Sequence, residues 1–99
     1  MDRQNALHLQ LRMQLYTLAG VLRRGEGDAR RLWSLADGAL DTHDDAGVEH
    51  QTLRNELVGL MREIAARRPF DAAGVADRLK ALADDVAHLP RHRDLALAG

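Results

Sequence analysis

The chain has 99 residues, of which 45% are hydrophobic and 29% charged, and this length suits one small globular domain. Leu and Ala make up a third of the residues, whereas Val, Ile and Thr together number nine, so the composition favours helices over a sheet. The absence of cysteine from the sequence excludes disulfides, thiolate nucleophiles and cysteine-ligated metal centres. A net charge of −1 argues against coating nucleic acid or an anionic membrane surface.

Glycine, aspartate and proline residues divide the chain into four segments of helical length. We expect helices over residues 2–24, 28–43, 46–68 and 71–89, and a tail over 91–99. Asp28 and Asp71 are the expected N-caps, because a carboxylate accepts the free backbone N–H groups of a first turn. Residues 1–90 would then form a single domain.

Apolar residues recur at helical spacing within each segment, which gives each predicted helix an apolar stripe. Trp33 and Leu57 lie on such stripes, and we expect both side chains to be buried. Connections of about four residues make successive helices antiparallel. The predicted fold is therefore all-α, an up-down-up-down antiparallel four-helix bundle.

The first predicted helix carries two apolar stripes. Its core face holds Leu7, Leu11, Leu15, Leu18 and Leu22. Leu9, Met13 and Tyr16 lie on nearly the opposite side, and Gly20 continues that second stripe. One face is enough for a monomeric bundle, so the second stripe predicts contact with another subunit or a protein partner. The alternative is that the helix buries both faces within the monomer, or that the tail covers the second.

The second stripe favours a non-catalytic interaction or regulatory module that self-associates as a homodimer or docks on a protein partner. We expect no cofactor, nucleic acid or membrane as a partner, and we expect a cytoplasmic location. Enzyme activity is not expected. Thr42 is the one hydroxyl residue next to a histidine, and adjacent residues of a helix do not face each other.

One end of the predicted bundle is rich in arginine. The residues brought there are Arg23, Arg24, Arg30, Arg31, Arg67 and Arg68. Such a cluster near helix N-termini is a candidate binding site for a phosphate or carboxylate. The alternative is that Arg23, Arg24, Arg67 and Arg68 offset the dipoles of helix C-termini without a ligand.

The opposite end of the predicted bundle collects the histidines. These are His8, His43, His50, His88 and His92. His43 and His50 continue the apolar stripes of their helices and have carboxylates nearby, so they are candidate ligands for zinc or nickel. The alternative is a pair of histidines at the end of the core, each hydrogen-bonded to aspartate or backbone.

Residues 15–26 read Leu15-Tyr16-Thr17-Leu18-Ala19-Gly20-Val21-Leu22-Arg23-Arg24-Gly25-Glu26. This run resembles the first helix and turn of the dimerisation hairpin in sporulation phosphotransferases and citrate-type sensor kinases. Those hairpins carry a phospho-accepting histidine where this chain has Leu9, and an asparagine where it has Met13. The resemblance implies a signalling-type helical bundle, and the missing histidine argues against phosphoryl transfer.

Two further segments read Tyr16-Thr17-Leu18-Ala19-Gly20 and Leu35-Ala36-Asp37-Gly38-Ala39-Leu40-Asp41. They resemble histidine-phosphotransfer (HPt) domains, which are four-helix bundles with the signature His-x-Leu-Lys-Gly. The histidine of that signature is Tyr16 in this chain. The two resemblances make a phosphorelay component the alternative function, with His8, displaced by one position from Leu9, as the phosphate acceptor.

Overall fold

The structure is a computed structural model that describes residues 3–47 and 50–87. This part of the chain forms four helices and no strand. The helices are α1 (Arg3–Arg24), α2 (Ala29–Asp45), α3 (Gln51–Ala65) and α4 (Ala72–Ala87). The predicted tail over 91–99 lies outside the described residues, as do His88 and His92.

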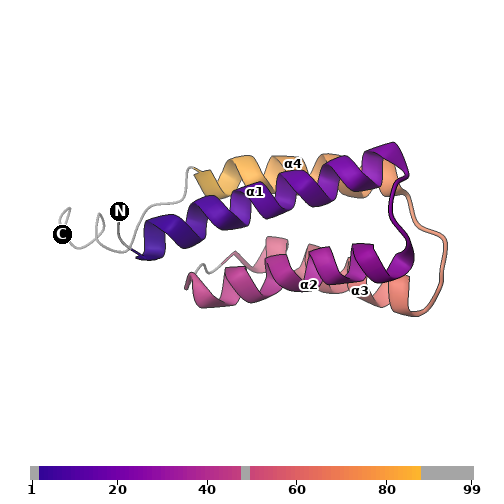
Figure 1. The fold of residues 1–99 in the computed structure, drawn as a ribbon, viewed down its shortest axis with the longest axis horizontal. Coiled ribbons are helices and arrows are strands. Elements are labelled where there is room, and N and C mark those ends of the chain that lie inside the picture. The colour runs from indigo at the N-terminus through magenta and orange to yellow at the C-terminus, as the bar shows by residue number, and fades with distance from the viewer. Residues whose placement is uncertain (1–2, 48–49, 88–99) are drawn as a thin grey trace.

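The four helices form an antiparallel up-down-up-down bundle, as the sequence predicts. Helix α1 packs against both α2 and α4, and α3 packs mainly against α2 and more weakly against α4. Figure 1 shows α1 and α4 side by side, with α2 and α3 forming the other half of the bundle. Helix α3 therefore lies diagonally across the bundle from α1.

Leucine side chains from α1, α3 and α4 build most of the core. The largest fully buried side chains are Leu11, Leu15, Leu18, Val21, Leu53, Leu57 and Leu79. Helix α2 contributes mainly small residues, Ala36 and Ala39. On the predicted core face of α1, Leu7 is half-buried and the other four leucines are buried, and the predicted burial of Leu57 on α3 is confirmed.

Both predicted aspartate caps are confirmed. The carboxylate of Asp28 accepts a hydrogen bond from the backbone N–H of Arg31 at 2.9 Å. The carboxylate of Asp71 accepts one from the N–H of Gly74 at 3.0 Å. Each bond satisfies a free donor in a first turn, which fixes where α2 and α4 begin.

The predicted start of the third helix near residue 46 is wrong. Ala46 instead closes α2, because its N–H donates to the carbonyls of Thr42 and Asp44. Gly47 then turns the chain at a φ of 67°, a left-handed conformation that glycine adopts without strain. Helix α3 begins only at Gln51, after the cap residue His50.

The predicted end of the third helix at residue 68 is also too late. Helix α3 ends at Ala65, and Arg67 has a left-handed φ of 56°. The N–H groups of Arg67 and Arg68 donate to the carbonyls of Ile64 and Glu63, each at 3.1 Å. These bonds satisfy carbonyls of the last turn, which explains why the helix stops before Pro69.

The predicted burial of Trp33 is wrong, since its side chain is 39% exposed. The buried residues of α2 are Ala36, Ala39, Thr42 and His43. At 100° per residue, Trp33 lies about 100° from the centre of that buried arc. The indole ring therefore leaves α2 at the border of its buried face, and the small residues Ala36 and Ala39 occupy the centre of that face.

None of the helices within residues 3–47 and 50–87 is long and apolar enough to span a membrane.

Candidate interaction surface

Three of the four exposed large hydrophobic residues in the described part of the chain lie on one face of α1. Leu9 is 45% exposed, Met13 61% and Tyr16 37%, and with Trp33 these are the large hydrophobic residues that the structure leaves exposed. On the opposite side of the same helix, Leu11 and Leu15 are fully buried. The predicted second stripe is therefore solvent-exposed, and α1 does not bury both faces within the described residues.

The spacing of this stripe follows a coiled-coil heptad. The positions are Ala6, Leu9, Met13, Tyr16 and Gly20, separated alternately by three and four residues. In heptad terms Met13 occupies an a position, flanked by Leu9 and Tyr16 at d positions. We call these five residues the α1 seam. Its spacing keeps all five on one side of the helix over two heptads.

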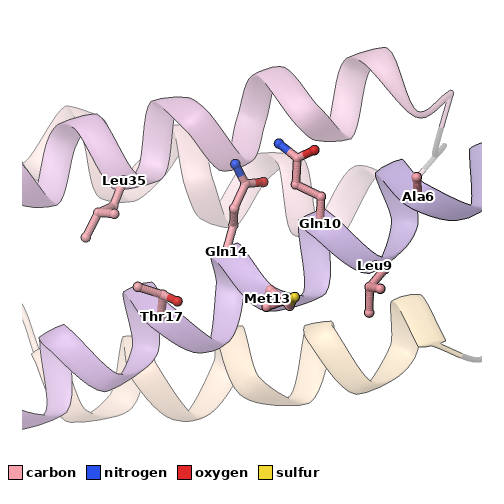
Figure 2. A pocket seen from close by; sticks show the side chains of 7 residues that line it. All are labelled: Ala6, Leu9, Gln10, Met13, Gln14, Thr17 and Leu35. Atoms are coloured by element: carbon pink, nitrogen blue, oxygen red, sulfur yellow. The ribbon is translucent and has the colours of Figure 1, made fainter. Parts of the chain in front are cut away.

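A groove of about 450 Å³ runs beside the seam. Its lining residues are Ala6, Leu9, Gln10, Met13, Gln14 and Thr17 of α1 and Leu35 of α2, and none of them is charged. Figure 2 shows Gln10 and Gln14 extending from α1 toward α2 at the upper edge of this groove. The groove adds an uncharged concave surface to the convex α1 seam.

The two glutamines tie α1 to α2 at the edge of the groove. Nε2 of Gln10 donates to Oγ1 of Thr42, and Nε2 of Gln14 donates to the carbonyl of Gly38, both at 3.4 Å. Oε1 of Gln14 is buried and has no hydrogen-bond partner within the described part of the chain. These contacts hold the edge of the groove in place and leave one buried acceptor beside it.

Tyr16 connects the seam to α4. Its hydroxyl donates a hydrogen bond to the carboxylate of Asp84. This bond, together with the negative charge of Asp84, raises the pKa of Tyr16, while the nearby Arg12 guanidinium acts in the opposite direction. Further along α1, Arg23 pairs with Asp77 of α4. The polar contacts on this side therefore hold the Tyr16 ring at the surface.

Gly20 lies at the end of the seam under the side chain of Arg24. A Cβ atom added at Gly20 would lie 3.0 Å from Nη1 of Arg24. Arg24 in turn pairs with Glu26 at 3.1 Å. A second helix can approach the backbone of Gly20 only after the flexible Arg24 side chain moves aside.

At the arginine-rich end, three of the six arginines pair with carboxylates of the same chain, whereas Arg30, Arg31 and Arg67 are exposed. Arg23 pairs with Asp77, Arg24 with Glu26, and Arg68 with Glu63 at 4.0 Å. Arg67 is exposed at the end of α3. The paired carboxylates compete with any anion, and the positions beside helix C-termini suit the interpretation in which these arginines offset the helix dipoles.

The two inward histidines have separate local partners. Nδ1 of the buried His43 lies 2.9 Å from the carboxylate of Asp44, and its Nε2 is buried without a partner within the described residues. His50 caps α3, with Nδ1 accepting from the N–H of Leu53 at 3.3 Å, and its Nε2 lies 3.7 Å from Asp85. No group of three His, Asp or Glu side chains suited to a metal ion occurs in residues 3–47 and 50–87.

His8, the acceptor in the phosphorelay alternative, is half-buried on α1. It directly precedes Leu9 in the chain, so its side chain leaves the helix about 100° away from the seam. The seam and His8 therefore belong to different faces of α1.

Sequence reasoning missed the parts of this surface that come from other helices. Leu35 lines the groove, and Asp84 holds Tyr16 from α4. The apolar spacing of α1 could not predict either residue, because both contacts depend on which helices become neighbours of α1.

No family model, curated protein or solved structure matches this chain. The class of protein that the fold and the surface define is a four-helix bundle with an exposed apolar seam on its first helix.

Proposed function

We propose that this chain is a non-catalytic protein-interaction module, located in the cytoplasm, whose docking surface is the α1 seam and the groove beside it. The observation that carries the proposal is the exposure of Leu9, Met13 and Tyr16 on one face of a helix whose other face is the core. Small soluble proteins rarely leave several large apolar side chains together in water unless a partner covers them. The uncharged groove widens this surface.

The surface chemistry suits a protein partner better than a nucleic acid or a small anion. Burial of the seam removes apolar area from water at a gain of roughly 25 cal/mol per Å². Tyr16 combines a large ring with a hydroxyl whose partner, Asp84, belongs to the same chain, so its burial leaves no unpaired donor. Residues of this kind are typical anchors of protein interfaces.

The test is affinity capture from the native cell extract with tagged wild-type chain and two variants. Met13→Asp places a charge in the seam, whereas Thr52→Asp places the same charge on the exposed surface of α3, diagonally across the bundle. The proposal expects a protein, either this chain itself or another one, that the wild type and Thr52→Asp retain and Met13→Asp loses. The partner must bind again when it is purified and mixed with the purified chain.

Both variants must keep the helical circular dichroism of the wild type. If every protein captured by the wild type is retained equally by a folded Met13→Asp variant, the seam is not the docking surface and the proposal is wrong.

A further inference from the structure

We infer that the partner on the α1 seam is a second copy of this chain, with α1 packing against α1 as a short two-helix coiled coil. This inference rests on the proposed function and names its partner. Its first support is the heptad spacing of Ala6, Leu9, Met13, Tyr16 and Gly20. A seam of a and d positions packs against another such seam, and a two-fold axis supplies one from the same patch of the second copy.

The second support is charge. All five seam residues and all seven groove residues are uncharged, in a chain of which 29% is charged. A strongly charged partner would lose its hydration against this surface and gain no ion pair in return. A second copy supplies a matching uncharged surface. At a net charge of −1, two copies also repel each other little at long range.

Three charged groups at the border of the seam have partners in their own chain, whereas the buried Nε of Arg12 has no hydrogen-bond partner within the described residues. Arg23 pairs with Asp77, Arg24 with Glu26, and Asp84 accepts the hydrogen bond of Tyr16. Two copies can therefore meet at Leu9, Met13 and Tyr16 without breaking the contacts of Arg23 and Asp84. At Gly20 the side chain of Arg24 must first move aside.

The seam side chains differ in how much conformational freedom they lose on binding. Tyr16 is already held by its bond to Asp84, so little further ordering of its ring is required. Met13, the most exposed of the three, is flexible and can adapt to a neighbouring side chain. Ala6 and Gly20 place small residues at the two ends of the seam.

The length of the seam limits the strength of the dimer. From Ala6 to Gly20 the helix rises about 21 Å, at 1.5 Å per residue. A contact of two heptads is small compared with a standard protein interface, so we expect a reversible dimer with a dissociation constant on the order of micromolar. Dilution can then dissociate the dimer, so the residues of its interface can be mapped in the wild-type chain without a mutation.

The first measurement is light scattering of the full chain over a range of concentrations. Wild type and Thr52→Asp should form a dimer, and Met13→Asp should weaken it by at least about 100-fold, because each dimer would bury two unpaired carboxylates. Met13→Leu should keep the dimer, since leucine is apolar and of similar volume. If Met13→Asp does not fold, Met13→Gln, polar but uncharged and similar in length, replaces it and should also weaken the dimer.

The second measurement is a dilution series of amide chemical shifts in the wild-type chain. The shifts that depend on concentration should map to residues 6–20 of α1 and to Leu35, whereas those of α3 should stay constant. A dimer that persists in a folded Met13→Asp variant, or shifts confined to α3, would overturn the inference.

A wild-type chain that stays monomeric at millimolar concentration would also overturn the inference. The affinity-capture experiment alone would then decide the proposed function. A captured protein that Met13→Asp loses would support a seam that binds another protein, and the absence of such a protein would contradict the proposal.

Discussion

Tyr16 on α1 donates its hydroxyl hydrogen bond to Asp84 on α4, across 68 positions of sequence. The bond joins the edge of the exposed seam to the helix with which α1 packs most extensively. It therefore makes the orientation of a surface ring depend on the tertiary structure. Because Tyr16 is the sole tyrosine, its titration reports this relationship directly.

The pKa of Tyr16 should lie above its ordinary value of about 10, because its bond to Asp84 and the charge of that carboxylate both disfavour the phenolate. Asp84→Asn removes the charge and should lower the pKa toward the ordinary value. Because the pKa of Tyr16 is raised in the folded chain, the Tyr16–Asp84 contact stabilises the fold fully below the pKa that Tyr16 has in the unfolded chain. This stabilisation is lost as the pH rises through the pKa of Tyr16 in the folded chain. Phenolate absorbance as a function of pH measures the pKa of Tyr16 in the wild type and in Asp84→Asn. The same titration curve in both chains would contradict the contact between Tyr16 and Asp84.

Leu57→Ala should destabilise the chain by about 2–5 kcal/mol, because Leu57 is fully buried in the core and its truncation leaves a cavity. Arg62→Ala, at an exposed position of the same helix, should change the free energy of unfolding by no more than about 0.5 kcal/mol. Urea denaturation at one low protein concentration compares the three chains. Equal midpoints for Leu57→Ala and the wild type would place Leu57 outside the core.

Two glycines should respond to alanine with opposite signs. Gly59 lies inside α3, and a Cβ atom there would meet nothing within 4 Å, so Gly59→Ala should stabilise by about 0.5–1 kcal/mol. Gly47 has a φ of 67°, so Gly47→Ala should destabilise by about 1 kcal/mol although space is available. Urea midpoints measure both, and stabilisation by Gly47→Ala would rule out the left-handed turn after α2.

Asp44 should contribute to stability at neutral pH and not in acid. The hydrogen bond with His43, together with the charge of Arg54, lowers the pKa of Asp44, although partial burial opposes this effect. Its contribution is therefore present above the unfolded pKa of about 4 and is lost as the pH falls through the lowered folded value. Asp44→Asn should cost at most about 1 kcal/mol at pH 7, since the side chain is half exposed.

Thermal midpoints of the wild type and Asp44→Asn should converge as the pH falls through the lowered pKa of Asp44. Asp41→Asn, a change of the same kind at an exposed position of α2, serves as the control. A constant difference between Asp44→Asn and the wild type down to pH 2 would show that Asp44 acts through something other than its charge.

Trp33 should emit as a partly solvated indole, because 39% of it is exposed. It is the only tryptophan, so fluorescence reports it alone. We expect efficient quenching by acrylamide in the folded chain and only a small red shift of the emission maximum on unfolding. Protection from quenching in the folded chain would place the ring in the core or in an interface.

Much of the fold could be predicted from the sequence, because helix formation depends on local features. Apolar spacing placed the core leucines of α1, α3 and α4, and the carboxylates of Asp28 and Asp71 marked two helix starts. Spacing also placed Leu9, Met13 and Tyr16 opposite the core face of α1, but their exposure was decided by the structure, since the spacing alone left open that α1 buries both faces.

Only the tertiary structure decided what depends on distances between helices. Helix α2 turns Ala36, Ala39, Thr42 and His43 toward the core and leaves Trp33 at the surface, although the spacing of Trp33 resembles that of a buried residue. The pairing of α1 with α4 gave Tyr16 its partner, and the pairing of α1 with α2 formed the groove at Leu35. Helical periodicity specifies the direction of a side chain from its own axis, whereas burial and hydrogen bonding depend on which neighbour lies in that direction and how closely it packs.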